Sequence, residues 1–252
     1  MSDPAAPSLP GAGRVAVVTG AGGGIGAAVA GRLAADGFRV AGVDLDLDSA
    51  RAALAELAGA TAFHCDVSNA ESVSRLGQAV VQTMGIPWLV VNAAGVFFTH
   101  HVPELSEEAW DETIDVNLKG PFLICRQFLP AMIAAGSGCV VNVASTAGLR
   151  GGHDRAAYCA SKAGLVMLTR SLALDHGRDG IRINCVCPGL IDTPMADWIT
   201  SRPEALESWR RSVPAQRIGK PDDIAAMVSF LASPQADYVH GAVLLVDGGV
   251  SA

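Results

Sequence analysis

The sequence predicts an α/β protein that folds as a single doubly wound domain around a parallel sheet of about seven strands. Short apolar runs alternate along the chain with longer segments of helical periodicity. The runs are continuously apolar, which is typical of parallel strands that helices cover on both faces. Repeated strand–helix–strand units also imply right-handed crossovers.

Seven apolar runs are the predicted strands, and in chain order they cover residues 15–18, 40–43, 61–65, 88–91, 139–143, 183–186 and 243–246. Helices are expected over 24–35, 117–135 and 158–176, where apolar residues recur at helical spacing. No composition shift or linker follows Gly13, so the domain should span 14–252. Residues 1–13 are rich in Pro and Gly and predict a flexible tail.

Composition excludes several classes of protein. Half of the residues are hydrophobic and 17% are charged, which excludes intrinsic disorder. The net charge of −7 comes without a basic run, so no nucleic-acid partner is expected. No apolar run reaches the ~18–20 residues that span a bilayer, and residues 1–13 do not resemble a signal peptide. The six Cys lack C-x-x-C spacing, which favours buried thiols over disulfides or metal ligands and indicates a cytoplasmic protein.

A glycine-rich turn follows the first predicted strand, with the sequence Thr19-Gly20-Ala21-Gly22-Gly23-Gly24-Ile25-Gly26. Backbone N–H groups of such a turn can approach a pyrophosphate at the positive end of the next helix. The general G-x-G-x-x-G fingerprint fails, because its third Gly would fall on Ile25; the spacing is Gly20-x-x-x-Gly24-x-Gly26. A plain tight turn is the alternative, but the position between strand and helix favours a Rossmann-type nucleotide site.

An acidic residue closes the second predicted strand. Asp44 lies 18 residues beyond Gly26, where a carboxylate can accept hydrogen bonds from the adenosine ribose. Its charge would repel a 2′-phosphate, and no Lys or Arg lies over 21–31 or 45–50 to bind one. A solvated residue at a strand end is the alternative. The pattern favours NAD(H) over NADP(H).

A hydroxyl and a Tyr–Lys pair follow the fifth predicted strand. Ser145 ends that strand, and Tyr158 and Lys162 come next, four residues apart on one helical face. A nearby ammonium favours the phenolate and lowers the pKa of a Tyr, so that it can exchange a proton near neutral pH. A Tyr–Lys pair alone is commonly just two exposed surface side chains, but this one follows a strand end that carries a hydroxyl.

With these motifs the sequence resembles the short-chain dehydrogenase/reductase family over nearly the whole chain, from Arg14 to Gly249. Its motifs occur in the family's order and spacing: Thr19-Gly20-x-x-x-Gly24-x-Gly26, Asp66, Asn92-Ala93-Ala94-Gly95, Asn117, Ser145, Tyr158-x-x-x-Lys162, and Pro188-Gly189 with Thr193. One departure is Ala93, where members often carry a second Asn.

The resemblance implies a catalytic role for four residues. Tyr158 would be the acid/base for the alcohol or carbonyl, and Ser145 would hydrogen-bond the same substrate oxygen. Lys162 would bind the nicotinamide ribose and lower the pKa of Tyr158. Asn117 would mark a helix distortion whose carbonyl holds a water in the proton relay; an interhelix hydrogen bond is the alternative.

The resemblance also implies which residues bind NAD(H), and it requires no metal. The adenosine half would contact the residues after the second, third and fourth strands, and the nicotinamide half those after the sixth. The implied set is Gly20, Gly24, Ile25, Gly26, Asp44, Asp66, Val67, Asn92, Gly95, Tyr158, Lys162, Pro188, Gly189, Ile191 and Thr193.

The implied function is an NAD(H)-dependent oxidoreductase that interconverts a small-molecule secondary alcohol and a ketone by hydride transfer. A dihydrodiol dehydrogenase or a 3-oxoacyl-type reductase of the same family is an alternative. A non-catalytic NAD-binding regulator is an alternative of another class, against which the intact Ser145, Tyr158 and Lys162 argue.

Three expectations concern substrate and assembly. Segment 191–216 is long for a connection and predicts a helical substrate lid, with packing or a subunit contact as the alternative. Arg155, just before Tyr158, is a candidate anchor for an anionic substrate; a solvated charge or a pair with Asp154 is the alternative. Helices 117–135 and 158–176 look apolar over more than one face, and similar proteins pair them, which predicts a homotetramer.

Overall fold

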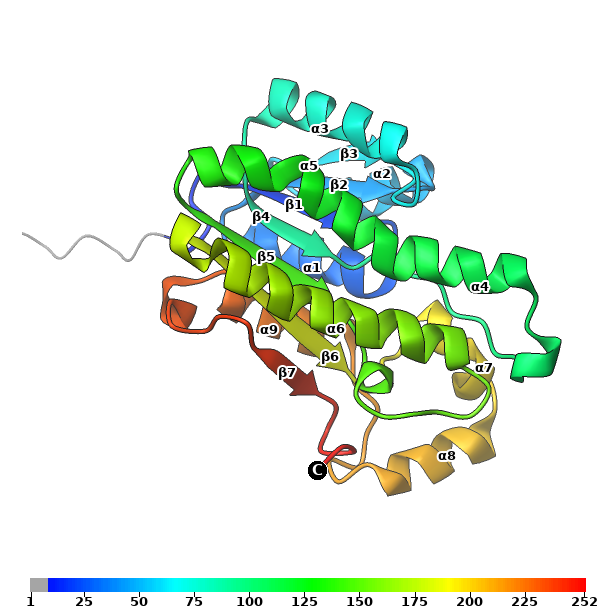
Figure 1. Ribbon diagram of the computed structural model, residues 1–252. Coiled ribbons are helices and arrows are strands. Elements are labelled where there is room, and N and C mark those ends of the chain that lie inside the picture. Colours follow the sequence, from blue (N-terminus) through cyan, green and yellow to red (C-terminus); the bar gives the residue numbers. More distant parts are fainter. Residues whose placement is uncertain (1–8) are drawn as a thin grey trace, which may run out of the picture.

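The computed structural model describes residues 9–252, which form a sheet between two layers of helices (Figure 1). The sheet has seven parallel strands in the order β3-β2-β1-β4-β5-β6-β7. The strands are β1 Val15–Thr19, β2 Arg39–Asp44, β3 Thr61–His64, β4 Pro87–Asn92, β5 Gly138–Val143, β6 Ile181–Pro188 and β7 Val243–Val246. The predicted doubly wound α/β fold is confirmed.

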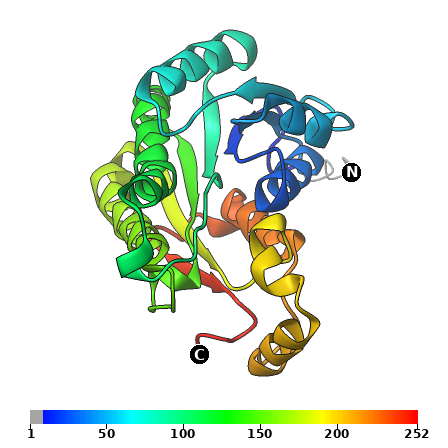
Figure 2. The same ribbon diagram turned by 90° about the vertical axis from the view of Figure 1, so that its right-hand side faces the viewer.

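The helices cover both faces of the sheet, as Figure 2 shows. They are α1 Gly24–Ala35, α2 Leu47–Leu54, α3 Ala70–Met84, α4 Glu107–Ile114, α5 Gly120–Ala134, α6 Ala156–His176, α7 Asp197–Thr200, α8 Pro203–Ser212 and α9 Pro221–Leu231. Val15 and Val17 pack with α3 and α5, whereas Ala16 and Val18 pack with α1 and α9. Because both faces are buried, successive strand residues are all apolar, which is the pattern seen in the sequence.

The direction in which strands are added reverses at the centre of the sheet. From β1 the chain adds β2 and β3 on one side, and then crosses to β4 on the other side of β1. In open parallel sheets such a reversal leaves a crevice at the carboxyl ends of the strands, where ligands bind.

Some boundaries differ from the expectation. Part of the predicted tail, residues 9–13, is a turn in which Gly11 N donates to Asp36 O at 2.9 Å, and Gly11 is buried against Phe38. The ordered packing therefore begins ahead of residue 14, while residues 1–8 lie outside the described part. Strand β6 is longer than 183–186, because it pairs with β5 along one half and with β7 along the other.

The helix expected over 117–135 is part of a longer helical stretch. It runs from Glu107 to Ala134 and contains a π-helical turn at Asp115–Lys119, between α4 and α5. Within residues 9–252, no helix is long and apolar enough to cross a membrane.

Candidate active site

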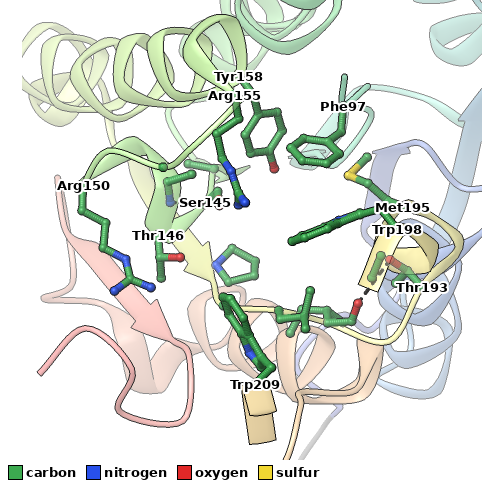
Figure 3. Close-up of a pocket in the computed structure, with 18 of the residues that line it drawn as sticks. Phe97, Ser145, Thr146, Arg150, Arg155, Tyr158, Thr193, Met195, Trp198 and Trp209 are labelled. Carbon is green, nitrogen blue, oxygen red and sulfur yellow. Dashed lines mark hydrogen bonds between the residues drawn. The ribbon is translucent and has the colours of Figure 1, made fainter. Parts of the chain in front are cut away.

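The residues singled out in the sequence gather at the carboxyl edge of the sheet. A cavity of about 320 Å³ lies there between the loops after β5 and β6, the start of α6, and the helices α7 and α8. Figure 3 shows the Tyr158 hydroxyl pointing into this cavity, with Trp198 and Trp209 on its other sides.

Ser145, Tyr158 and Lys162 are brought together by β5 and α6. Lys162 Nζ lies 5.6 Å from the centre of the Tyr158 ring, and it donates to Val143 O at 3.1 Å. Ser145 follows the end of β5, and its Oγ accepts from Ala147 N at 3.1 Å. Accepting this bond does not use the single O–H donor of the Ser145 hydroxyl.

Burial controls the protonation of these groups. It raises the pKa of Tyr158 to about 12, although a hydrogen bond with Ser145 and the charge of Arg155 oppose the rise. It also lowers the pKa of Lys162 to about 8. The net lowering of the Tyr158 pKa expected from the Tyr–Lys spacing is therefore not found, because loss of hydration disfavours the phenolate more than the Ser145 hydrogen bond and the Arg155 charge favour it.

Asn117 lies in the π-helical turn and is fully buried. Its Oδ1 accepts from Val96 N at 2.8 Å and its Nδ2 donates to Val96 O at 2.9 Å. Nδ2 also donates to Ser161 Oγ at 3.2 Å, and Ser161 donates to Tyr158 O at 2.8 Å. The expected helix distortion is thus present, and the side chain also makes the interhelix tie that holds the loop after β4 against α6.

The glycine-rich turn between β1 and α1 fits a pyrophosphate. Gly23 is the N-cap of α1, and no side chain hydrogen-bonds to the positive end of this helix. A Cβ added to Gly23 would meet nothing within 4 Å, which leaves the backbone open to a ligand. Gly20 and Gly26 serve packing, because a Cβ on Gly26 would overlap Gly20 O.

Asp44 lies beside this turn at the end of β2. Its Oδ2 accepts from Gly22 N at 2.8 Å and its Oδ1 accepts from Asp46 N at 3.0 Å, which fixes the carboxylate in place. The residue is partly exposed, and each carboxylate oxygen keeps a further acceptor position. The arrangement fits two ribose hydroxyls.

The candidates after β3 lie along the same edge. Asp66 Oδ1 accepts from Ser68 N at 2.9 Å and from Ser68 Oγ at 2.6 Å, so its own turn holds the carboxylate. Val67 is buried, and its side chain packs closely on Gly120: a Cβ added to Gly120 would lie 3.0 Å from Val67 Cγ2.

The two candidates after β4 differ from each other. Gly95 lies against the site, because a Cβ there would be 3.1 Å from Asn117 Oδ1 and 3.5 Å from Lys162 Nζ. Asn92 is buried inside the protein, where its Nδ2 donates to Asn142 Oδ1 at 2.8 Å. Its side chain therefore supports the sheet, and a cofactor contact at this position would come from the backbone.

Segment 191–216 forms the short helices α7 and α8, and residues of both line the cavity. Its two ends are tied together, since Asp192 N donates to Gly219 O and Gly219 N donates to Leu190 O, both at 2.9 Å. The nicotinamide-side candidates Pro188, Gly189, Ile191 and Thr193 line the same cavity, together with Met195, Trp198 and Trp209. Closure of this segment over a substrate stays a prediction.

Phe97 and Thr19 contribute to the site in ways that the sequence motifs did not predict. The Phe97 ring packs edge-on against Tyr158, with centroids 4.9 Å apart, and lies 6.0 Å from the Trp198 ring. Its place just after Gly95, in a loop at the carboxyl edge, was the available signal. Thr19 Oγ1 accepts from the backbone N–H groups of Ala93 and Ala94, each at 3.1 Å, and so joins the ends of β1 and β4.

The Cys residues are free thiols, and all except the half-buried Cys159 are buried. Burial raises the pKa of Cys125 to about 12 and that of Cys139 to about 11, so both stay protonated. In the described chain, residues 9–252, no group of three His, Cys, Asp or Glu side chains is placed to hold a metal ion.

The fold and the site define a class: a Rossmann-type α/β protein with an open glycine-rich turn and a Ser–Tyr–Lys cluster at the carboxyl edge of its sheet. A family model described as enoyl-(acyl carrier protein) reductase matches residues 20–251. Together with the relatives described next, this match shows that the chain belongs to the short-chain dehydrogenase/reductase family and is an oxidoreductase.

The relatives are similar over almost their full length. The chain is 41% identical over 243 residues to D-threitol dehydrogenase of Mycolicibacterium smegmatis, covering 94% of this chain and 92% of the relative. It is 37% identical to meso-2,3-butanediol dehydrogenase of Serratia marcescens, covering 95% of each. A solved structure of a putative NAD(P)-dependent gluconate 5-dehydrogenase from Beutenbergia cavernae, with bound NADP, is 35% identical with a TM-score of 0.92, covering 96% of this chain and 99% of that one.

Proposed function

We propose that this protein interconverts a secondary alcohol and a ketone, with NAD(H) as the hydride carrier and Tyr158 as the acid/base. One observation carries the proposal: the Tyr158 hydroxyl faces a cavity beside Ser145, with Lys162 on the same helix. The relatives named threitol and butanediol dehydrogenase act on alcohols of this kind, which supports it.

Each residue of the cluster has a separate task. Bound NAD(H) supplies or accepts the hydride at its nicotinamide ring. Ser145 donates its O–H to the substrate oxygen and orients the reacting carbon. Tyr158 is protonated at neutral pH, so it gives its proton to the carbonyl oxygen in reduction. In oxidation it takes the proton of the alcohol as its own proton passes to the relay water. Lys162 holds the nicotinamide ribose and favours the phenolate as it forms.

Asn117 is proposed to act with this cluster through its backbone. Its side chain is fully used by Val96 and Ser161, so the group left for a proton-relay water is the carbonyl, in the irregular π-helical turn. The clamp on Val96 also keeps the loop after β4 in place beside Lys162.

The proposed cofactor is NAD(H) rather than NADP(H), because Asp44 offers a fixed carboxylate where a 2′-phosphate would need a cation. The binding residues are those expected from the family resemblance, with Asn92 contributing only its backbone. We also propose a cytoplasmic homotetramer. Exposed apolar side chains on α5 and α6, namely Phe122, Met167 and Leu174, support assembly through these two helices.

Tyr158→Phe tests the function, because it keeps the half-buried ring and removes the transferable proton. We expect kcat to fall by about 10²–10⁴-fold, or more if the cluster acts as a unit, while NADH still binds. The matched control is Tyr238→Phe, since Tyr238 is the other Tyr of the chain and is fully exposed. Near-normal kcat in Tyr158→Phe contradicts the mechanism. A wild-type protein that binds NADH but oxidises nothing in a broad alcohol panel would instead be a non-catalytic regulator.

A further inference from the structure

The cavity beside Tyr158 is lined by positive charge without a compensating carboxylate. Arg150 and Arg155 contribute to its wall, and none of its lining residues in the described chain is Asp or Glu. The whole chain carries a net charge of −7, so this local excess of positive charge runs against the overall composition. Most of the remaining wall is apolar or aromatic.

The backbone next to Arg155 is held in an unusual conformation. Asp154 has φ = 60°, in the left-handed region that costs a non-glycine residue energy. Two contacts hold it there: Asp154 O accepts from His100 N at 2.8 Å, and Asp154 Oδ1 lies 2.9 Å from His101 Nδ1. The carboxylate of Asp154 is therefore paired with His101, and the alternative in which it pairs with Arg155 is wrong.

The Arg155 side chain is positioned by aromatic rings rather than by an acid. Its guanidinium carbon lies 5.1 Å from the Trp198 ring centre and 5.7 Å from that of Phe97, and Nε donates to His153 O at 3.0 Å. Within residues 9–252, no carboxylate comes within 4.0 Å of this guanidinium. Its two terminal nitrogens form a planar fork that matches the oxygens of an anion.

Gly152 makes room for this placement. A Cβ added at Gly152 would lie 2.6 Å from Arg155 Cδ and 2.9 Å from Nε, closer than such atoms approach. Three features thus determine where the Arg155 guanidinium lies: the missing side chain at Gly152, the turn at Asp154 and the two aromatic rings. The guanidinium lies beside the proposed acid/base, Tyr158 (Figure 3).

We propose that Arg155 anchors the substrate through an anionic group, so that the enzyme acts on a hydroxy or keto compound that carries a carboxylate, sulfonate or phosphate a short chain away from the reacting carbon. This inference rests on the proposed function, because it assumes that the reacting oxygen meets Tyr158. Arg150 is not the anchor: it is exposed, and its Nη1 donates to Val250 O at 3.3 Å.

The test compares substrates that differ in charge and little in shape. A β-hydroxy acid and its primary amide are assayed, and hydroxyalkyl sulfonates and phosphates of similar length identify the preferred anion. We expect the wild type to favour the best anion over the amide by about 10- to 100-fold in kcat/KM. Arg155→Gln should bring this ratio close to one. Any effect of the substitution on Tyr158 changes kcat/KM for both substrates equally and so leaves the ratio unchanged. The ratio should also fall with added salt, because the guanidinium is partly exposed.

Two further variants separate position from charge. Gly152→Ala keeps every charge but displaces the Arg155 stem, so the ratio should fall by about tenfold. Arg150→Gln removes a charge from the same loop and should change the ratio by less than about fivefold. A wild type that uses acid and amide equally overturns the anchor, as does an Arg155→Gln variant in which kcat/KM falls equally for both.

Failure of the proposed function can be told apart from failure of the anchor. If wild-type protein turns over no alcohol in the broad panel and none of these anions or the amide, the proposed reaction is wrong, and binding of the β-keto acid and its amide is measured by calorimetry with NADH present. Tighter binding of the acid in wild type, lost in Arg155→Gln, still supports the anchor. Equal binding of acid and amide in wild type overturns it.

Discussion

Asp44 should make this enzyme prefer NAD over NADP, and the size of the preference follows from how the carboxylate is held. Because Gly22 N and Asp46 N both donate to it, the carboxylate cannot turn away from a 2′-phosphate without losing two hydrogen bonds. Two unit charges about 5 Å apart repel by about 1–3 kcal/mol for effective dielectric constants between roughly 20 and 80. We therefore expect kcat/KM to favour NAD by about 5- to 150-fold.

The informative substitution is Asp44→Asn, which removes the charge and keeps one oxygen to accept from the turn. For NADP, kcat/KM should rise by about 5- to 150-fold, the factor that charge repulsion costs the wild type. For NAD, kcat/KM should fall by about tenfold, because the ribose hydroxyls lose a charged acceptor. Asp48→Asn is the control, since Asp48 lies nearby on α2 and pairs with Arg51 at the surface. The assay is kcat/KM for both cofactors at fixed ionic strength. Equal use of NAD and NADP by the wild type, or an unchanged ratio in Asp44→Asn, would refute the reasoning.

Three other predictions concern stability and assembly. Lys162→Met should abolish turnover yet stabilise the fold at pH 7 by up to about 3 kcal/mol, because burial lowers the Lys162 pKa from 10.5 to about 8. This advantage should shrink between pH 8 and 10.5, where folded wild type has lost the proton and the unfolded chain still binds it; thermal melts that show no such trend contradict it. Gly26→Ala should lower the free energy of unfolding by about 1–3 kcal/mol or more, because its Cβ would overlap Gly20 O. Gly31→Ala, in the same helix with open space around it, should leave that free energy unchanged or raise it by up to about 1 kcal/mol. Equal melting temperatures for the two variants would be inconsistent with this packing. Light scattering at micromolar concentration should give a tetramer, and a monomer alone would exclude assembly through α5 and α6.

Much of this protein was predictable from local patterns. The strand positions followed from continuously apolar runs, because a parallel strand between two helical layers has no polar face. The positions of Asp44 and Ser145 at the carboxyl edge followed from their places after such runs, since crossovers in one direction bring these ends together. The shared face of Tyr158 and Lys162 followed from helical spacing alone.

Other features depended on contacts between distant parts of the chain. The Asn92 side chain pairs with Asn142 on the neighbouring strand, and Phe97 packs against Tyr158 from the loop after β4, whose Val96 is bound by Asn117. The position of Arg155 depends on Trp198, which lies far along the sequence.

The sequence by itself determined the order of the elements and which side chains share an element, because both depend on residues that are close neighbours along the chain. Only the tertiary structure decided that the pKa of Tyr158 is raised rather than lowered, and which groups surround the Arg155 guanidinium. The physical reason is hydration: the energy of a charge depends on how much water the other elements exclude and which dipoles and rings replace it, and no spacing along one helix contains that information.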